Sequence, residues 1–150
     1  MINVNVYGLD QFVVGDLSKE ISPKLAKLYE VEEEEVFFTS TNNMVFHDGL
    51  DQTAWRVIIE VNAPKKVEVL QDQVVELLQH YFSTVGIHIE YLFKYFSVDH
   101  YVKKINPDYP LFMRDDNIVN LESEYTEEME EGEEEDQIYT GNIFDDMDIN

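Results

Sequence analysis

Four residues could carry out acid–base chemistry or hold a charged substrate. An α-amine has an ordinary pKa of about 8 and an imidazole has one of about 6.5, so Met1 and His88 are candidate proton carriers. Arg56 could hold a carboxylate through two parallel hydrogen bonds, and Glu90 follows His88 at the spacing of one strand face. We therefore consider Arg56 and Glu90 as candidate substrate-binding residues.

Two of these residues also have purely structural interpretations. Arg56 could form an ion pair with Glu60 or Glu90 in the interior of an oligomer, since structural ion pairs of this kind are common. His88 could be held by hydrogen bonds to a neighbouring strand. The sequence alone leaves both interpretations open.

The other histidines show no spacing that is typical of a metal site. The chain has no HExxH pattern and no cysteine, which excludes thiolate ligands, thiolate nucleophiles and disulfides. His47-Asp48-Gly49 is more simply the sequence of a turn. A glycine-rich phosphate loop is also missing from the sequence, so we expect neither a metal nor a cofactor.

The net charge of −22 is unevenly distributed along the chain. Residues 1–114 hold ten Lys or Arg and 17 Asp or Glu, whereas residues 115–150 hold 15 acidic residues and no basic one. Such a surface repels phosphate groups, so we expect no direct binding to nucleic acid or membranes. The sequence predicts neither a signal peptide nor a membrane span, and we expect a cytoplasmic protein.

Two strand–helix–strand units must position the candidate residues. Hydrophobic periodicity predicts strands over residues 2–7, 35–41, 55–62 and 87–96, and helices over residues 17–28 and 67–85. A short hairpin-like excursion near residues 44–49 separates the two units. Right-handed crossovers place both helices on one face of a four-stranded mixed sheet, so we expect an α+β fold of order β-α-β-β-α-β.

The strand pattern assigns the candidate residues to the face without helices. Trp55 and Ile87 would begin apolar rows that face the helices, and Arg56, His88 and Glu90 would lie on the opposite, polar face. In the first helix, Asp16 is the expected N-cap. Pro23 either kinks this helix or marks a new start capped by Ser22, and the sequence does not choose between them.

Composition divides the chain into three parts. We expect a domain over residues 1–96, a C-terminal segment over residues 97–114 that packs on the domain or a neighbour, and a disordered acidic tail over residues 115–150. Ile138-Tyr139 and Ile143-Phe144 interrupt the acidic residues, a composition often used for docking. The tail could therefore serve solubility, dock on its own domain, or bind a partner protein.

Residues 36–49, VFFTSTNNMVFHDG, resemble the second strand and following turn of macrophage migration inhibitory factor. The order of elements over residues 1–96 is also similar to that of the tautomerase superfamily, and more closely to an uncharacterised bacterial branch of it. This resemblance implies a homotrimer in which three sheets face inward. It also implies an active site between subunits, at the start of the first strand, where an N-terminal proline acts as general base or acid.

The sequence departs from the family pattern at this site. Ile2 stands where the family has proline, so we expect the primary amine of Met1 at the N-terminus. The family's lysine falls near residues 29–35, which hold five Glu and no Lys, and its last-strand tyrosine and asparagine map approximately onto His88 and Glu90. Acidic surroundings keep an amine protonated, which opposes its use as a base.

We therefore expect a tautomerase-like protein that lacks proline-dependent catalysis and acts as an oligomeric binding or structural protein. The first alternative is a diverged enzyme for a small anionic keto or enol substrate, with the Met1 amine or His88 as proton carrier and Arg56 holding the substrate. A second alternative is an acidic decoy that imitates nucleic acid and inhibits a basic protein.

Overall fold

The computed structural model describes residues 1–41 and 44–113, and a compact unit runs from Met1 to Phe112. The predicted acidic tail, residues 115–150, lies outside the described residues. The elements follow one another in the order β1 (Ile2–Tyr7), α1 (Gln11–Tyr29), η1 (Glu33–Glu35), β2 (Val36–Ser40), β3 (Phe46–His47), β4 (Leu50–Asp51), β5 (Arg56–Pro64), η2 (Lys65–Leu70), α2 (Gln71–Phe82), β6 (His88–Phe96) and η3 (Val98–His100), where η marks a 3₁₀ helix.

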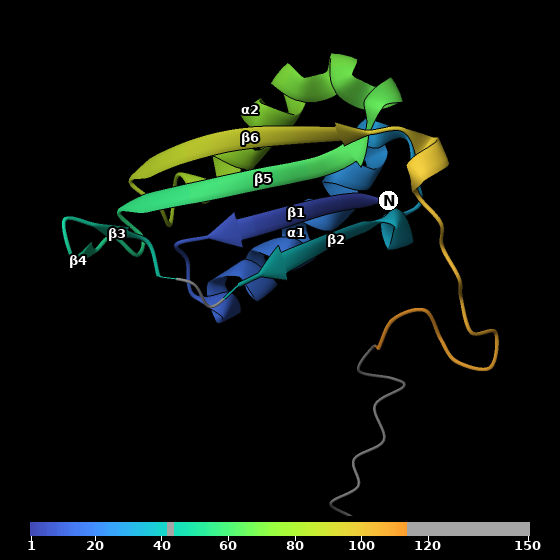
Figure 1. Ribbon diagram of the computed structural model, residues 1–150, viewed down its shortest axis with the longest axis horizontal. Coiled ribbons are helices and arrows are strands. Elements are labelled where there is room, and N and C mark those ends of the chain that lie inside the picture. The colour runs from blue at the N-terminus through green and yellow to red at the C-terminus, as the bar shows by residue number, and fades with distance from the viewer. Residues whose placement is uncertain (42–43, 114–150) are drawn as a thin grey trace, which may run out of the picture. The chain divides into compact units, whose positions relative to one another are not determined.

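The four long strands form one mixed sheet in the order β2-β1-β5-β6. Strand β1 is parallel to β2 and antiparallel to β5, and β5 is parallel to β6. Figure 1 shows both helices on the same face of this sheet, as right-handed crossovers require. The predicted α+β architecture of a four-stranded mixed sheet with two helices on one face is confirmed.

The hydrophobic core lies between the sheet and the helices. The alternating residues Ile2, Val4 and Val6 of β1 are almost completely buried, and Val4 and Val6 pair with the equally buried Val61 and Ile59 of β5. Trp55 and Ile87 were wrongly assigned to this core and are 56% and 63% exposed. Strands β5 and β6 begin one residue later than predicted, which leaves both side chains in the preceding loops.

Helix α1 is longer than the periodicity predicted and runs through Pro23 without a second start. Its N-cap is Asp10, whose carboxylate accepts a hydrogen bond from the Phe12 amide at 2.8 Å, so the prediction of Asp16 was wrong. Pro23 lies on the exposed side of the helix, where water can satisfy the carbonyl that loses its amide partner. Among the described residues, no helix is long and apolar enough to cross a lipid bilayer.

The excursion between the two units is a two-stranded hairpin, with β3 paired antiparallel to β4. Asp48 and Gly49 at its tip both have positive φ, at 48° and 77°. Two-residue hairpin loops favour this left-handed backbone, because its twist matches that of the strands. The predicted turn at His47-Asp48-Gly49 is confirmed.

Candidate functional site

The start of β1 and the start of β2 lie side by side because these strands are parallel. Ile2 pairs with Val36 in the register, so the residues that precede them, Met1 and Glu35, meet at one end of the sheet. Strand β6 ends at this same end, since Phe96 pairs with Pro64 on the antiparallel neighbour of β1. The chain that follows β6 can therefore reach the N-terminus.

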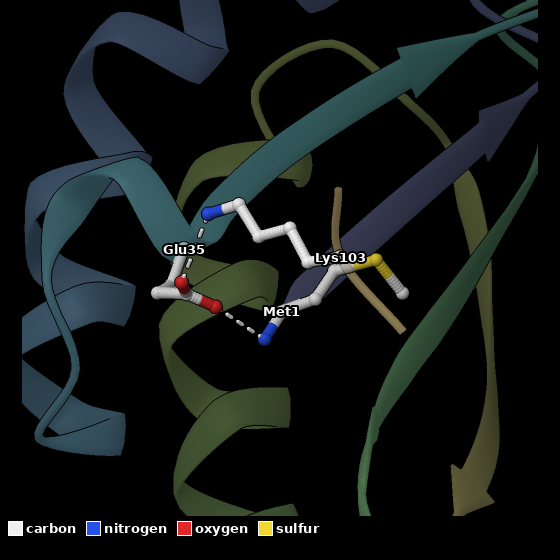
Figure 2. Close-up of polar contacts among 3 residues, drawn as sticks. All are labelled: Met1, Glu35 and Lys103. Atoms are coloured by element: carbon white, nitrogen blue, oxygen red, sulfur yellow. Dashed lines mark hydrogen bonds and ion pairs between the residues drawn. The ribbon is translucent and has the colours of Figure 1, made fainter. Parts of the chain in front are cut away.

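Glu35 binds two cations with its two carboxylate oxygens (Figure 2). Its Oε2 lies 2.6 Å from the Met1 amine nitrogen, and its Oε1 lies 3.3 Å from Lys103 Nζ. The hydrogen bond from the Met1 ammonium lowers the pKa of the Glu35 carboxyl below its ordinary value of 4.5, and Lys103 adds to this effect, although partial burial opposes it. The carboxylate is therefore charged at neutral pH.

These three residues border a cavity of about 250 Å³. Its other lining residues are Glu34, Phe37, Tyr101, Leu111 and Phe112. About a third of the Glu35 side chain is exposed, at 32%, so the ion pairs are partly solvated rather than sealed. We call this cavity the Met1 pocket.

Three other candidate residues gather at the opposite end of the sheet. Arg56 Nη2 lies 2.5 Å from Glu90 Oε1, and His88 contacts Trp55 edge to face with ring centroids 5.7 Å apart. With Gln52 they border an open hollow of about 410 Å³. Of the two partners that the sequence left open for Arg56, the structure selects Glu90.

The imidazole of His88 is exposed, and within the described part of the chain no hydrogen bond to it is found. The cross-strand hydrogen bonds considered for the His88 imidazole are therefore not formed within this part of the chain. Because β5 runs antiparallel to β1, Arg56 and His88 lie beyond the C-terminal end of β1, whereas Met1 lies at its start. A single chain thus does not bring Met1 and His88 into one site.

The helix-free face of the sheet carries a polar cluster between these two ends. Glu60 is only 8% exposed and accepts hydrogen bonds from Asn5 and Asn62 at 3.1 and 3.0 Å. Lys94 Nζ lies 2.6 Å from its other oxygen. Burial alone would raise the pKa of Glu60, but the bonds from Lys94, Asn62 and Asn5 outweigh burial and lower it.

Two features of the Met1 pocket were not identified from the sequence. Glu35 was not singled out, although it is one of the five Glu in residues 29–35, which the family resemblance placed near the N-terminal amine. Lys103 carried no signal, because it lies 68 residues from Glu35 in a segment without periodicity. Glu35 could have been identified from the parallel pairing of β1 and β2, because this pairing places the starts of the two strands side by side.

Solved structures that resemble this chain support the fold. One is a domain of unknown function (DUF1904) from Sebaldella termitidis, with a TM-score of 0.62 and 18% identity over 69% of this chain and 95% of the other. Another is a macrophage migration inhibitory factor homologue from Prochlorococcus marinus, with a TM-score of 0.54 and 17% identity over 69% of this chain and 94% of the other. A protein of unknown function from Vibrio cholerae aligns with a TM-score of 0.58 and 15% identity over 68% of this chain and 83% of the other.

No protein-family model matches the sequence, and no curated protein matches it either. The three solved structures share less than a fifth of their residues with this chain, so the likeness is one of fold. At that level, the resemblance expected from residues 36–49 and the element order is confirmed. The chain has the fold of a macrophage migration inhibitory factor homologue.

Proposed function

We propose that this protein is a diverged tautomerase-fold protein, a cytoplasmic homotrimer that acts in binding or in structure rather than in proline-dependent tautomerisation. The observation that carries the proposal is the 2.6 Å ion pair between the Met1 ammonium and Glu35. A general base needs a free lone pair near working pH. In this pocket the amine nitrogen instead donates a hydrogen bond to a charged carboxylate.

The charges around the amine support the same conclusion. A carboxylate beside an amine favours its charged form, whereas a base needs the neutral form. Lys103 is the second cation of the pocket, but its ammonium is bound to the same Glu35. That contact reduces its ability to stabilise an enolate oxygen on a bound substrate.

The test is the ketonisation of the enol of phenylpyruvate, measured with the full chain. We expect a rate equal to that of a protein-free blank. As a positive variant, a proline inserted between Met1 and Ile2 would take the place of Met1 once the initiator methionine is removed, and Glu35→Gln would remove the opposing charge. Mass spectrometry must confirm the N-terminal residue of each protein. Turnover by the unmodified chain that disappears when its amine is acetylated would contradict the proposal.

The oligomeric part of the proposal rests on the fold and on the polar, helix-free sheet face. A face that carries the Glu60–Lys94 pair can line a wet interior between subunits. Light scattering coupled to size exclusion should give three times the chain mass of 17.6 kDa. A mass of one chain at micromolar concentration would contradict a trimer.

A second candidate function is that of a diverged enzyme for a small anionic keto or enol substrate. The observation that favours it is the gathering of Arg56, His88 and Glu90 around one hollow. Arg56 would hold the substrate carboxylate, and His88 or the Met1 amine would carry the proton. The Arg56–Glu90 ion pair opposes this function, because a substrate would have to displace Glu90.

Separate Arg56→Lys and His88→Gln variants test this second function once any turnover is found. An enzyme of this kind should lose substrate affinity with the first variant and turnover with the second. If neither variant changes either parameter, the hollow is not an active site.

A further inference from the structure

The segment that follows β6 covers the end of the sheet where the N-terminus lies. Tyr101, Lys103, Leu111 and Phe112 of this segment line the Met1 pocket, which Met1 borders from the sheet side. Figure 2 shows Lys103 directed toward Glu35, with the Glu35 carboxylate between the two cations. The pocket therefore owes part of its wall to residues that lie after the last strand.

This covering segment, residues 97–112, contributes no strand to the described sheet. The Tyr101 amide donates a hydrogen bond to the Val98 carbonyl, and the Tyr109 amide donates one to the Asn106 carbonyl, so these bonds join residues of the segment itself. Val102 and Tyr109 are 77% and 70% exposed. Segments with few buried contacts and no ladder bonds open locally at low cost.

The Lys103–Glu35 ion pair joins this segment to the start of β2, where the N-terminus lies. The Lys103 and Glu35 side chains are both 32% exposed, so the ion pair is partly solvated, and its charged atoms lie 3.3 Å apart. A partly exposed ion pair shifts a local equilibrium by roughly two- to fivefold.

We infer that residues 97–112 form a strap that closes the Met1 pocket, with the Lys103–Glu35 ion pair as its latch. Opening of the strap exposes the Met1 amine to molecules larger than water, and closing hides it. The strap is independent of the proposed function, because it controls access whether or not the pocket performs chemistry.

The accessibility of the Met1 amine tests the strap. The full chain is treated with a low concentration of an acetylating N-hydroxysuccinimide ester at neutral pH, and acetylation of the N-terminal peptide is followed by mass spectrometry. Lys103→Met should increase the rate roughly two- to fivefold. Lys103→Met leaves the contact between Glu35 and the Met1 amine in place, so a faster rate reports access to the amine rather than loss of that contact.

Lys104→Met is the matched control, because it removes the same charge from the next residue, which makes no ion pair within the described structure. It should label at the rate of the unmodified chain. An unchanged or slower rate for Lys103→Met would overturn the strap, and so would an equal increase in both variants. A melting curve of each variant separates local opening from global unfolding.

Discussion

The Met1 amine nitrogen lies 2.6 Å from Glu35 Oε2, although 34 residues separate the two along the chain. The contact follows from strand register, because Ile2 pairs with Val36 in the parallel β1–β2 ladder. Here the strand start carries an ammonium with a carboxylate as its counter-ion.

Removal of the Glu35 charge should destabilise the fold slightly. Glu35→Gln keeps the shape of the side chain but leaves Met1 and Lys103 without their counter-ion, and we expect a loss of about 0.5–1 kcal/mol in the free energy of unfolding. Urea denaturation at pH 7 and low salt measures this loss. Glu33→Gln removes the same charge from an exposed neighbour and should leave the stability unchanged.

The stability difference between the unmodified chain and Glu35→Gln should depend on pH. The Met1 hydrogen bond lowers the pKa of Glu35 below 4.5 in the folded state, so the folded state holds its proton less tightly than the unfolded state. The contribution is therefore complete above about pH 4.5 and declines as the pH falls through the folded-state pKa. Denaturation curves of both proteins, recorded at intervals of roughly one pH unit between pH 3 and 7, measure this difference in the free energy of unfolding. A difference that grew toward low pH would contradict the ion pair.

The sequence predicted the parts of the fold that depend on side-chain alternation. Ile2, Val4 and Val6 alternate with polar residues, and this pattern is sufficient to identify a strand with one buried face. The start of α1 was placed too late because Phe12, a large apolar residue in its first turn, is 74% exposed and breaks the amphipathic pattern. Capping by Asp10 depends on backbone geometry rather than on periodicity.

The candidate site was predicted only in part, for a physical reason. Arg56, His88 and Glu90 share a strand face or pair across adjacent strands, so periodicity brought them together correctly. The contacts of the Met1 pocket instead depend on parallel register and on the path of residues 97–112, and neither leaves a periodic signal. The role of Lys103 as a partner of Glu35 could therefore be identified only from the three-dimensional structure.

Glu60 should matter more for stability than any other ion-paired carboxylate of the open sheet face. Glu60→Ala leaves the amides of Asn5 and Asn62 and the ammonium of Lys94 without their acceptor, which costs about 1–3 kcal/mol. Glu90→Ala removes a carboxylate that is 52% exposed, and its loss should stay below about 1 kcal/mol. Urea denaturation of both variants at the same pH compares them directly, and equal losses would contradict the difference in burial.

Substitution by alanine should have opposite effects on protein stability at Gly8 and at Gly15. Gly8 has φ of 81°, and a Cβ there would lie 2.4 Å from the backbone oxygen of Arg56, so Gly8→Ala should cost about 2–4 kcal/mol. Gly15 lies within α1 with open space around it, and Gly15→Ala should stabilise the protein by about 0.5–1 kcal/mol. Thermal melts of the two variants check the signs.

The ion pair between the Met1 ammonium and Glu35 is tested most directly by the titration of the Glu35 carboxyl carbon, followed by NMR in the full chain. We predict that the pKa of this carboxyl lies below 4.5 and rises when the Met1 amine is acetylated, because acetylation removes the cation that donates to it. A Glu35 pKa at or above 4.5, or one that acetylation leaves unchanged, would contradict the account.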